Sequence, residues 1–187
     1  MIPFKINRSY RRFHQEVEIP QEHLISMVEA ARFSPSSRNV QPIKFYLNNS
    51  REMNARIFPH LAWAGYLKEW EGPQEGERPA GYIVFLHDKS ISATYSCDNG
   101  IFAQSILLQA VELGWGGCII ASINKQEIAS LLELPQNLDP ILVIALGKPK
   151  EKIVIDNVKG GDIKYWRDQD GTHHVPKRTL EELIWKP

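Results

Sequence analysis

Residues 98–120 read DNGIFAQSILLQAVELGWGGCII, and this segment decides the fold. Between Ile101 and Leu113 it consists of good helix formers without a proline, which predicts one helix. The apolar side chains occupy nearly the whole circumference, so protein must cover this helix on nearly every side. The segment is too short for a membrane span, which needs about 20 apolar residues. We therefore expect the helix inside a domain or at a subunit interface.

The predicted helix ends in a glycine-rich turn. Gly114 lies where a left-handed C-cap is expected, and Gly116 and Gly117 let the backbone approach another group closely. A short buried strand is predicted immediately afterwards, at residues 118–121. A buried helix that ends in a glycine turn beside a strand end is a usual place for a bound cofactor.

Composition and charge bound the class of protein. With 187 residues, 43% of them hydrophobic and 24% charged, the chain is typical of a single globular domain covering residues 1–187. The 22 basic and 22 acidic side chains give no net charge, so no general attraction to nucleic acid is expected. The first residues lack a secretory signal, and Cys97 and Cys118 form no disulfide framework. We expect a cytoplasmic protein without nucleic-acid or membrane partners.

Hydrophobic periodicity predicts an α+β fold with four core strands, about five helices and a late hairpin. The strands are expected at residues 43–47, 80–86, 118–121 and 141–146, the last stopped by Gly147 and Pro149. Besides the central helix, helices are expected at residues 20–33, from 51 to a break at Pro59, at 63–70 and from 125. Capping boxes are predicted at Asn124 with Glu127 and at Thr179 with Glu182, although a terminal strand stays open. The hairpin is expected to turn at residues 168–171.

Polar segments carry the chemistry: RSYRR at residues 8–12, SPSSRNVQP at 34–42 and PKR at 176–178. Together with the 98–117 helix and its glycine exit, and with ALGKP at 145–149, they resemble the nitroreductase-like family of FMN-dependent oxidoreductases. The resemblance extends over nearly the whole chain. It implies a central, mostly antiparallel sheet flanked by helices. It also implies a homodimer whose buried central helix packs against its symmetry mate, with two FMN sites at the interface.

The resemblance implies that the two ends of the chain converge on the FMN phosphate. A phosphate dianion favours guanidinium groups, which bind its oxygens in pairs. The residues expected there are Arg8, Ser9, Arg11, Arg12, Lys177 and Arg178. Asn7 stands where many members have a further arginine, so Arg11, Arg12 and the PKR segment are expected to contribute more. For RSYRR taken alone, a solvated basic N-terminus is an equally good interpretation.

The resemblance also implies contacts with the flavin ring. A loop of the partner subunit is expected to lie against the ring, and its contact residues are Pro35, Ser36, Ser37, Asn39 and Gln41. The side-chain amides of Asn39 and Gln41 offer both donors and acceptors. The backbone at Gly116 and Gly117 is expected near flavin N5 and O4. Two alternatives stay open: an ordinary turn-rich loop at 34–42, and a plain helix end at the glycines.

Two other features permit more than one interpretation. Trp63, Tyr66 and Trp70 form one aromatic face of the predicted short helix, which belongs to the core or to a pocket wall that stacks on an aromatic ligand. His173 and His174 are neighbours on a strand and point to opposite faces, with no cluster of carboxylates or cysteines beside them. We therefore nominate no metal site. Because the resemblance implies that the flavin supplies the chemistry, we also nominate no catalytic acid or base.

The function implied by the resemblance is FMN-dependent oxidoreduction in a homodimer. A hydride passes from NADH or NADPH to flavin N5 and on to a nitroaromatic, quinone or similar small acceptor, in a ping-pong sequence. Alternatives are a non-enzymatic flavin-binding or regulatory module, dehalogenase-type flavin chemistry on the same fold, and an unrelated α+β protein whose basic ends bind another phosphate ligand or RNA. The sequence ends at Pro187, soon after Arg178, so the arm that embraces the partner in larger relatives is expected to be short.

Overall fold

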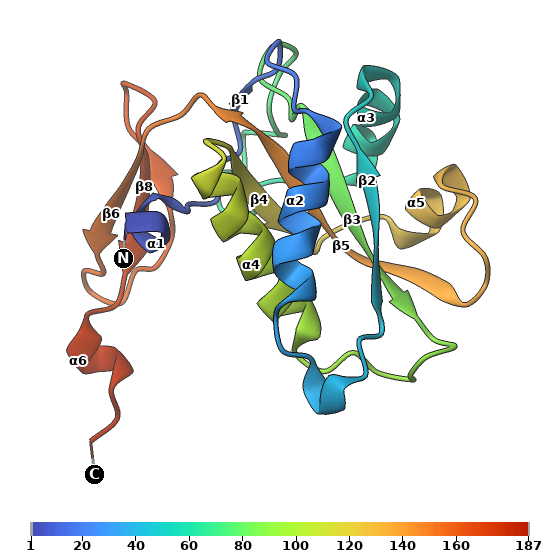
Figure 1. The fold of residues 1–187 in the computed structure, drawn as a ribbon. Coiled ribbons are helices and arrows are strands. Elements are labelled where there is room, and N and C mark those ends of the chain that lie inside the picture. Colours follow the sequence, from blue (N-terminus) through green and yellow to red (C-terminus); the bar gives the residue numbers. More distant parts are fainter. Residues whose placement is uncertain (1, 187) are drawn as a thin grey trace.

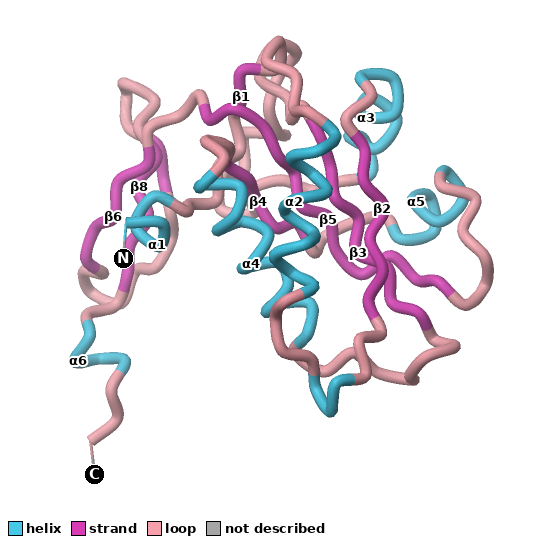
Figure 2. Tube along the Cα trace, in the orientation of Figure 1, coloured by secondary structure: helices cyan, strands magenta, loops and turns pink. Residues whose placement is uncertain are grey.

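A computed structural model describes residues 2–186 as a main sheet covered by helices on both faces, with a smaller sheet beside it (Figure 1, Figure 2). The helices are α1 (Ile2–Ile6), α2 (Gln21–Arg32), α3 (Arg51–Ile57), α4 (Asp98–Glu112), α5 (Lys125–Leu131) and α6 (Leu180–Leu183), with short 3-10 helices η1 (Ser37–Asn39) and η2 (Phe58–His60). The strands are β1 (Phe13–His14), β2 (Ile43–Asn48), β3 (Gly81–Asp88), β4 (Gly116–Ile120), β5 (Leu138–Pro149), β6 (Ile153–Asn157), β7 (Trp166–Arg167) and β8 (His173–Lys177). No helix in this part of the chain is long and apolar enough to cross a membrane.

The main sheet explains the continuous apolar strands of the sequence. Its strands run antiparallel in the order β1-β5-β3-β2, and β4 also pairs with β5. On β3, Ile83 and Phe85 pack with residues of α2 and α4, whereas Tyr82 and Val84 pack with residues of α3 and α5. Successive side chains of a strand point to opposite faces, so a strand covered on both faces needs apolar residues throughout. The α+β class and the mostly antiparallel sheet are thus confirmed.

The central helix α4 is covered by its own chain on one side only. Its buried side packs against α2 and the sheet through Phe102, Ala103, Ile106, Leu107 and Ala110. On the other side, Leu108 and Val111 are only half-buried. The all-round apolar pattern therefore exceeds what one chain needs to cover this helix. Gly114 caps the helix with the expected left-handed backbone, at φ 79°.

The smaller sheet brings the C-terminal segment next to α1 at the other end of the chain (Figure 1). β7 and β8 form the predicted antiparallel hairpin, in which the Asp168 carbonyl accepts from the Gly171 N–H at 3.1 Å. The sequence pattern does not predict β6, which pairs parallel with β8. A parallel partner comes from outside the hairpin, so local alternation carries no signal for it.

The helix α6 follows the smaller sheet and projects away from the main body (Figure 1). It begins with the predicted capping box, in which Thr179 and Glu182 bond each other's backbone N–H groups. Its apolar side chains are exposed, with Leu180 at 66% and Leu183 at 67%, and Trp185 just beyond the helix is 83% exposed. A short arm with an apolar surface thus extends from the body.

The predicted helix at residues 63–70 is wrong, because this segment is an irregular loop. Ala64 has a left-handed backbone with φ 34°, which does not fit within an α-helix. Trp63 turns towards Phe58, with 5.8 Å between ring centroids. Tyr66 packs against Tyr165, which lies just before β7. Trp70 packs against the guanidinium of Arg167 in β7. The three aromatic side chains therefore make three separate contacts instead of one face.

The strand β5 continues to Pro149 instead of stopping after residue 146. The ring of Phe13 lies across Gly147, where an added Cβ would be only 2.9 Å from a ring carbon. Glycine at this position lets β1 pair with the end of β5. As a result, the segment that precedes β1, with its arginines, is held against the main sheet.

Candidate functional site

A cavity of 320 Å³ lies where the two ends of the chain meet α4 and β4. Three of its lining side chains are cations, Arg8, Arg11 and Lys177. The others are neutral: Asn7, Ser9, Gln104, Leu107, Ile119, Tyr165, His173 and Val175. No carboxylate among the described residues lines the cavity or pairs with any of these three cations. The cavity is therefore a concentrated site of positive charge.

Backbone pairing explains how the N-terminal arginines reach this cavity. Ser9 forms a parallel bridge with Gly117, and the Tyr10 N–H donates to the Gly117 carbonyl at 3.0 Å. The segment therefore runs alongside the start of β4. From the other end of the chain, Lys177 is the last residue of β8 and the third lining residue of that strand. The expected convergence of the two termini thus arises from strand pairing at both ends.

The guanidinium of Arg11 is held in place by neutral groups. Its Nη1 donates to the Ser9 carbonyl at 3.2 Å and lies 3.3 Å from His173 Nε2. Its Cζ lies 4.9 Å from the centroid of the Tyr165 ring. The nearby carboxylate of Glu151 bonds the backbone N–H of Arg11 rather than its guanidinium, and its second oxygen accepts from Arg167 at 3.1 Å. The Arg11 side chain therefore keeps its full positive charge.

Arg8 has a similar environment. Its Nε donates to the Asn7 carbonyl at 2.5 Å, and its Nη2 donates to the Phe4 carbonyl at 2.7 Å. These carbonyls orient the guanidinium without neutralising it. With the hydroxyl of Ser9 beside it, the site offers cationic and neutral hydrogen-bond donors to one anion.

Arg12 and Arg178 lie outside this cavity. Arg12 forms a two-pronged pair with Glu77, at 2.6 Å from Nε and 2.5 Å from Nη2, and Lys150 lies 3.2 Å from the same carboxylate. The hydrogen bonds from Arg12 lower the pKa of Glu77 to about 2. Arg178 lies 3.5 Å from Glu182 at the start of α6. Both arginines thus have carboxylate partners that the cavity arginines lack.

The loop from Pro35 to Gln41 is anchored to the N-terminus of α4, away from the cavity. The Ser36 hydroxyl donates to Asp98 Oδ2 at 2.6 Å, and the Ser37 N–H donates to Asp98 Oδ1 at 2.9 Å. Asn39 and Gln41 are exposed and have left-handed backbones, with φ 56° and 53°. Such strained residues persist where other contacts hold them and concentrate at binding sites. None of these predicted residues lines the cavity of their own chain.

Gly116 and Gly117 are buried in β4 and do not line the cavity either. An added Cβ at Gly116 would be 2.5 Å from the Tyr10 ring, and one at Gly117 would be 2.7 Å from the Ala145 carbonyl. Side chains therefore occupy the space that a side chain at Gly116 would need, and the contact of the Gly116 and Gly117 backbone with the flavin ring stays a prediction. Packing within the chain accounts for glycine at both positions.

The open surface of β4 lies further along the strand. Ile119, which is 42% exposed, lines the cavity together with Arg11. Both residues also line a neighbouring hollow of 140 Å³, formed by residues 62–65 and 118–122. The two hollows thus share a border at Arg11 and Ile119, and together they follow the edge of β4 beyond the glycines.

Seven lining residues are absent from the predicted set: Asn7, Gln104, Leu107, Ile119, Tyr165, His173 and Val175. For His173 the sequence does contain a signal. Alternate residues of a strand share one face, so His173 and Val175 lie on the same face of β8 as the predicted Lys177. All three line the cavity. Tyr165 and Gln104 belong to other elements, and no local pattern connects them with the basic ends.

His173 and His174 point to opposite faces of β8, as the strand pattern predicts. His173 is fully buried, and burial together with the charge of Arg11 lowers its pKa to about 4, so its ring is neutral at pH 7. His174 lies between two carboxylates, 2.7 Å from Asp156 and 3.2 Å from Asp168. The hydrogen bonds that the His174 ring makes to these carboxylates raise its pKa.

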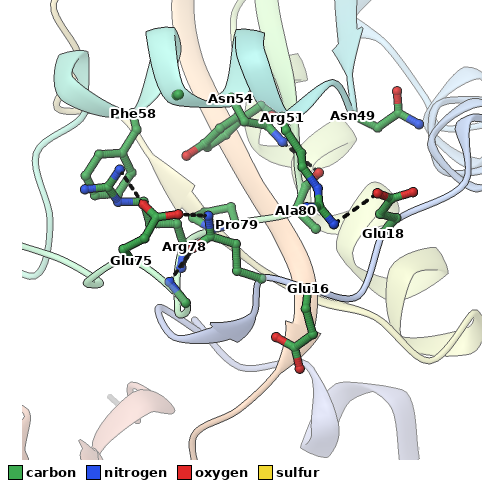
Figure 3. Close-up of a pocket in the computed structure, with 14 residues that line it drawn as sticks. Glu16, Glu18, Asn49, Arg51, Asn54, Phe58, Glu75, Arg78, Pro79 and Ala80 are labelled. Carbon is green, nitrogen blue, oxygen red and sulfur yellow. Dashed lines mark hydrogen bonds and ion pairs between the residues drawn. The ribbon is translucent and has the colours of Figure 1, made fainter.

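A second cavity, of 390 Å³, opens between α3 and the loop at residues 75–80 (Figure 3). Its main charged side chains form pairs with one another. Arg78 Nη1 lies 3.0 Å from Glu75, and Arg51 Nη2 lies 3.1 Å from Glu18 (Figure 3). Because its arginines are already neutralised and none of the predicted residues lines it, this cavity is the weaker candidate for an anionic cofactor.

Similarity to known proteins extends from sequence to fold. The sequence profile of the Nitroreductase family matches residues 7–148. A protein of Methanothermobacter thermautotrophicus, provisionally named as an NADH dehydrogenase/NAD(P)H nitroreductase, is 29% identical over 153 residues, which cover 79% of this chain and 75% of that protein. Among solved structures, an FMN-dependent nitroreductase from Clostridium difficile R20291 is 26% identical, with a TM-score of 0.65 and coverage of 81% of this chain and 89% of its own. A nitroreductase family protein from Streptococcus pneumoniae TIGR4 is 16% identical and has a TM-score of 0.71. The match covers 100% of this chain and 98% of that protein, so the common fold includes the C-terminal sheet.

Proposed function

Because the chain belongs to the nitroreductase family, we propose that it is an FMN-dependent NAD(P)H oxidoreductase that binds the FMN phosphate in the cavity of Arg8, Arg11 and Lys177. One observation carries the choice of site: three cations share a cavity in which no carboxylate of residues 2–186 neutralises them. Like charges at close range repel each other, and a bound dianion removes that repulsion. The names of the FMN-dependent and NAD(P)H-dependent relatives support the cofactor and the electron donor.

The residues of the cavity suit a phosphate ester. The guanidinium groups of Arg8 and Arg11 each present several N–H donors to phosphate oxygens, and Lys177 adds a point charge. The Ser9 hydroxyl supplies a neutral donor. The hollow that adjoins Arg11 and Ile119 extends the site along β4, and we place the remainder of the cofactor on that side.

When bound, FMN supplies the hydride chemistry at N5, between NAD(P)H and a nitroaromatic, quinone or similar small acceptor, with ping-pong kinetics. The chain contributes binding and orientation. His173 is held neutral, and burial raises the pKa of the Cys118 thiol, so neither group offers a ready proton or nucleophile. We therefore nominate no catalytic acid or base from the chain, and we place the protein in the cytosol.

We propose further that the functional unit is a homodimer. The loop of Asn39 and Gln41 and the cavity of Arg11 are separate in one chain, so both can serve one cofactor only if the loop comes from a second copy. The half-buried outer side of α4, the exposed ring of Phe33 and the apolar side chains of α6 support such an interface. Apolar groups that a single chain leaves exposed are candidates for subunit contacts.

The oligomeric state can be measured by sedimentation velocity with the full chain. We expect a dimer, and we expect Leu183→Ser combined with Trp185→Ser to shift it towards monomer by removing apolar contact. Lys186→Ser is the matched control in the same arm and leaves the dimer intact. A wild-type monomer in the presence of FMN contradicts the shared site.

The absorbance spectrum of the purified protein tests the proposed function most directly. We expect a yellow protein, or one that turns yellow and melts at a higher temperature when FMN is added, because a ligand of the folded state stabilises it. Under anaerobic conditions NADH or NADPH should bleach the colour, and a quinone or nitroaromatic should restore it. A yellow protein that NAD(P)H does not bleach indicates a flavin-binding module, and a colourless protein unaffected by FMN refutes the proposal.

A further inference from the structure

His173 is the one lining residue of the cavity whose side chain is fully buried and has a polar atom without a partner among residues 2–186. Its Nε2 lies 3.3 Å from Arg11 Nη1, and its Nδ1 contacts no donor or acceptor. A buried polar group without a partner costs about 1–3 kcal/mol, so it calls for an explanation.

The contact with Arg11 determines the form of the ring. A guanidinium has donors only, so Nε2 must accept and cannot carry a proton. The proton of the neutral ring is therefore on Nδ1, which is the atom without a partner. The same contact opposes protonation, because an imidazolium beside Arg11 would bring two cations together. Burial and the charges of Arg11 and Arg167 hold the pKa of His173 at about 4, in agreement with this geometry.

We propose that His173 is a positioning residue of the phosphate site, which fixes the Arg11 guanidinium by accepting its hydrogen bond without cancelling its charge. This inference rests on the proposed function, because it concerns the anion that Arg11 is proposed to bind. It also explains why a neutral acceptor stands where a carboxylate would bond the guanidinium more strongly. A carboxylate there would neutralise Arg11, as Glu77 neutralises Arg12.

The surroundings of Arg11 follow the same rule. The Ser9 carbonyl and the Tyr165 ring are its other contacts, and both are uncharged. The carboxylate of Glu151, which lies nearby, bonds the Arg11 backbone N–H and Arg167. The His173 ring also packs at 5.3 Å against Tyr165, so it supports both neighbours of the guanidinium. A site that orients a cation with neutral groups only keeps that cation available for a ligand.

The test compares three substitutions at residue 173 by measuring the affinity for FMN and for riboflavin, which lacks the phosphate. His173→Gln places a neutral oxygen the same number of bonds from Cβ as Nε2. His173→Glu places a charged oxygen there, and His173→Phe keeps a ring for Tyr165 but offers no acceptor. The ratio of FMN to riboflavin affinity in each variant is the readout, because general damage to the fold lowers both affinities together.

We expect His173→Gln to keep the ratio within about 3-fold of wild type, His173→Phe to lower it about 10-fold, and His173→Glu to lower it about 100-fold, since the last removes the net charge of Arg11. Nitrogen NMR of the wild-type imidazole should show one neutral form, protonated on Nδ1, throughout pH 5.5–8. The inference is overturned if His173→Glu keeps the wild-type ratio or if Nε2 carries the proton. If wild-type protein shows no preference for FMN over riboflavin, the proposed phosphate site itself fails, which distinguishes the two outcomes.

Discussion

Arg11 and Arg12 are adjacent in the sequence, yet their guanidinium groups lie in two regions of opposite character. Arg12 lies in a neutralised region, where Nε and Nη2 on one edge of its guanidinium bond both oxygens of Glu77 while Lys150 approaches the same carboxylate. Arg11 lies in a charged region, where its guanidinium contacts only uncharged groups of the described chain. The first region is complete within the chain, whereas in the second the guanidinium has no carboxylate partner among residues 2–186.

The difference shows that the positions of carboxylates, rather than of arginines, define the anion site. Side chains that are neighbours on an extended segment point to opposite sides. On one side, Glu77 of the 71–79 loop meets Arg12. On the other side, both oxygens of Glu151 are occupied by the Arg11 backbone and by Arg167, and they leave the Arg11 guanidinium free.

Removing one guanidinium at a time tests the difference between Arg11 and Arg12 most directly. We expect Arg11→Met to weaken FMN binding about 10- to 100-fold, as the loss of charge-assisted hydrogen bonds worth about 1.5–3 kcal/mol predicts. Arg12→Met is the matched control, with the same change one residue away, and it should leave the FMN dissociation constant within about 2-fold. Fluorescence quenching of FMN measures both. Equal losses would falsify the distinction between the two regions.

Substitutions in the neutralised region of Arg12 and Glu77 should instead lower the stability of the fold. Arg12 and Glu77 are 29% and 17% exposed, so their pair is partly shielded from water. We expect Arg12→Met to lower the free energy of unfolding by about 1–2 kcal/mol, between the values for exposed and buried pairs. Urea unfolding of Arg12→Met, Glu77→Gln and the double variant measures the coupling. Additive effects of the two substitutions would show that the pair contributes nothing.

The contribution of the Arg12–Glu77 pair to stability should depend on pH. Hydrogen bonds from Arg12 hold the pKa of Glu77 at about 2, below its ordinary value of 4.5. A carboxylate with a lowered pKa stabilises the fold above its unfolded pKa, and this contribution is lost as pH falls from about 5 to 2. Wild type should therefore lose more stability than Glu77→Gln between pH 6 and pH 3. Parallel losses in urea titrations would argue against the pair.

The smallest effect on stability is expected from the two histidines of β8. Like the two arginines, they are neighbours in the sequence, and only one of them bonds carboxylates. His174 bonds Asp156 and Asp168, and its raised pKa stabilises the fold below pH 6.5, with a loss as pH rises through the raised value. His173 is buried and neutral with a pKa of about 4, so its contribution is present above pH 6.5 and is lost as pH falls towards 4. Proton NMR should show His174 titrating above the ordinary histidine range and His173 well below it. Similar midpoints for the two rings would contradict the opposite environments.

Much of the fold follows from local sequence. Apolar runs locate β2, β3, β4 and β5, and caps at Ser50, Asn124 and Thr179 begin three helices. The misses occur where distant contacts outweigh local pattern. Residues 63–70 have helical spacing, but each aromatic side chain finds a different tertiary partner. The parallel strand β6 depends on β8, its distant partner in the smaller sheet.

By itself, the sequence determined the family, the class of fold and the basic segments at the two ends of the chain, because periodicity, caps and short motifs are local properties of the chain. Only the tertiary structure decided which cations of those segments remain free to bind an anion. The reason is that charge is neutralised across space: Glu77 lies 65 residues from Arg12, and Glu151 lies 140 residues from Arg11. No spacing along the chain encodes which of two adjacent arginines such a carboxylate will reach.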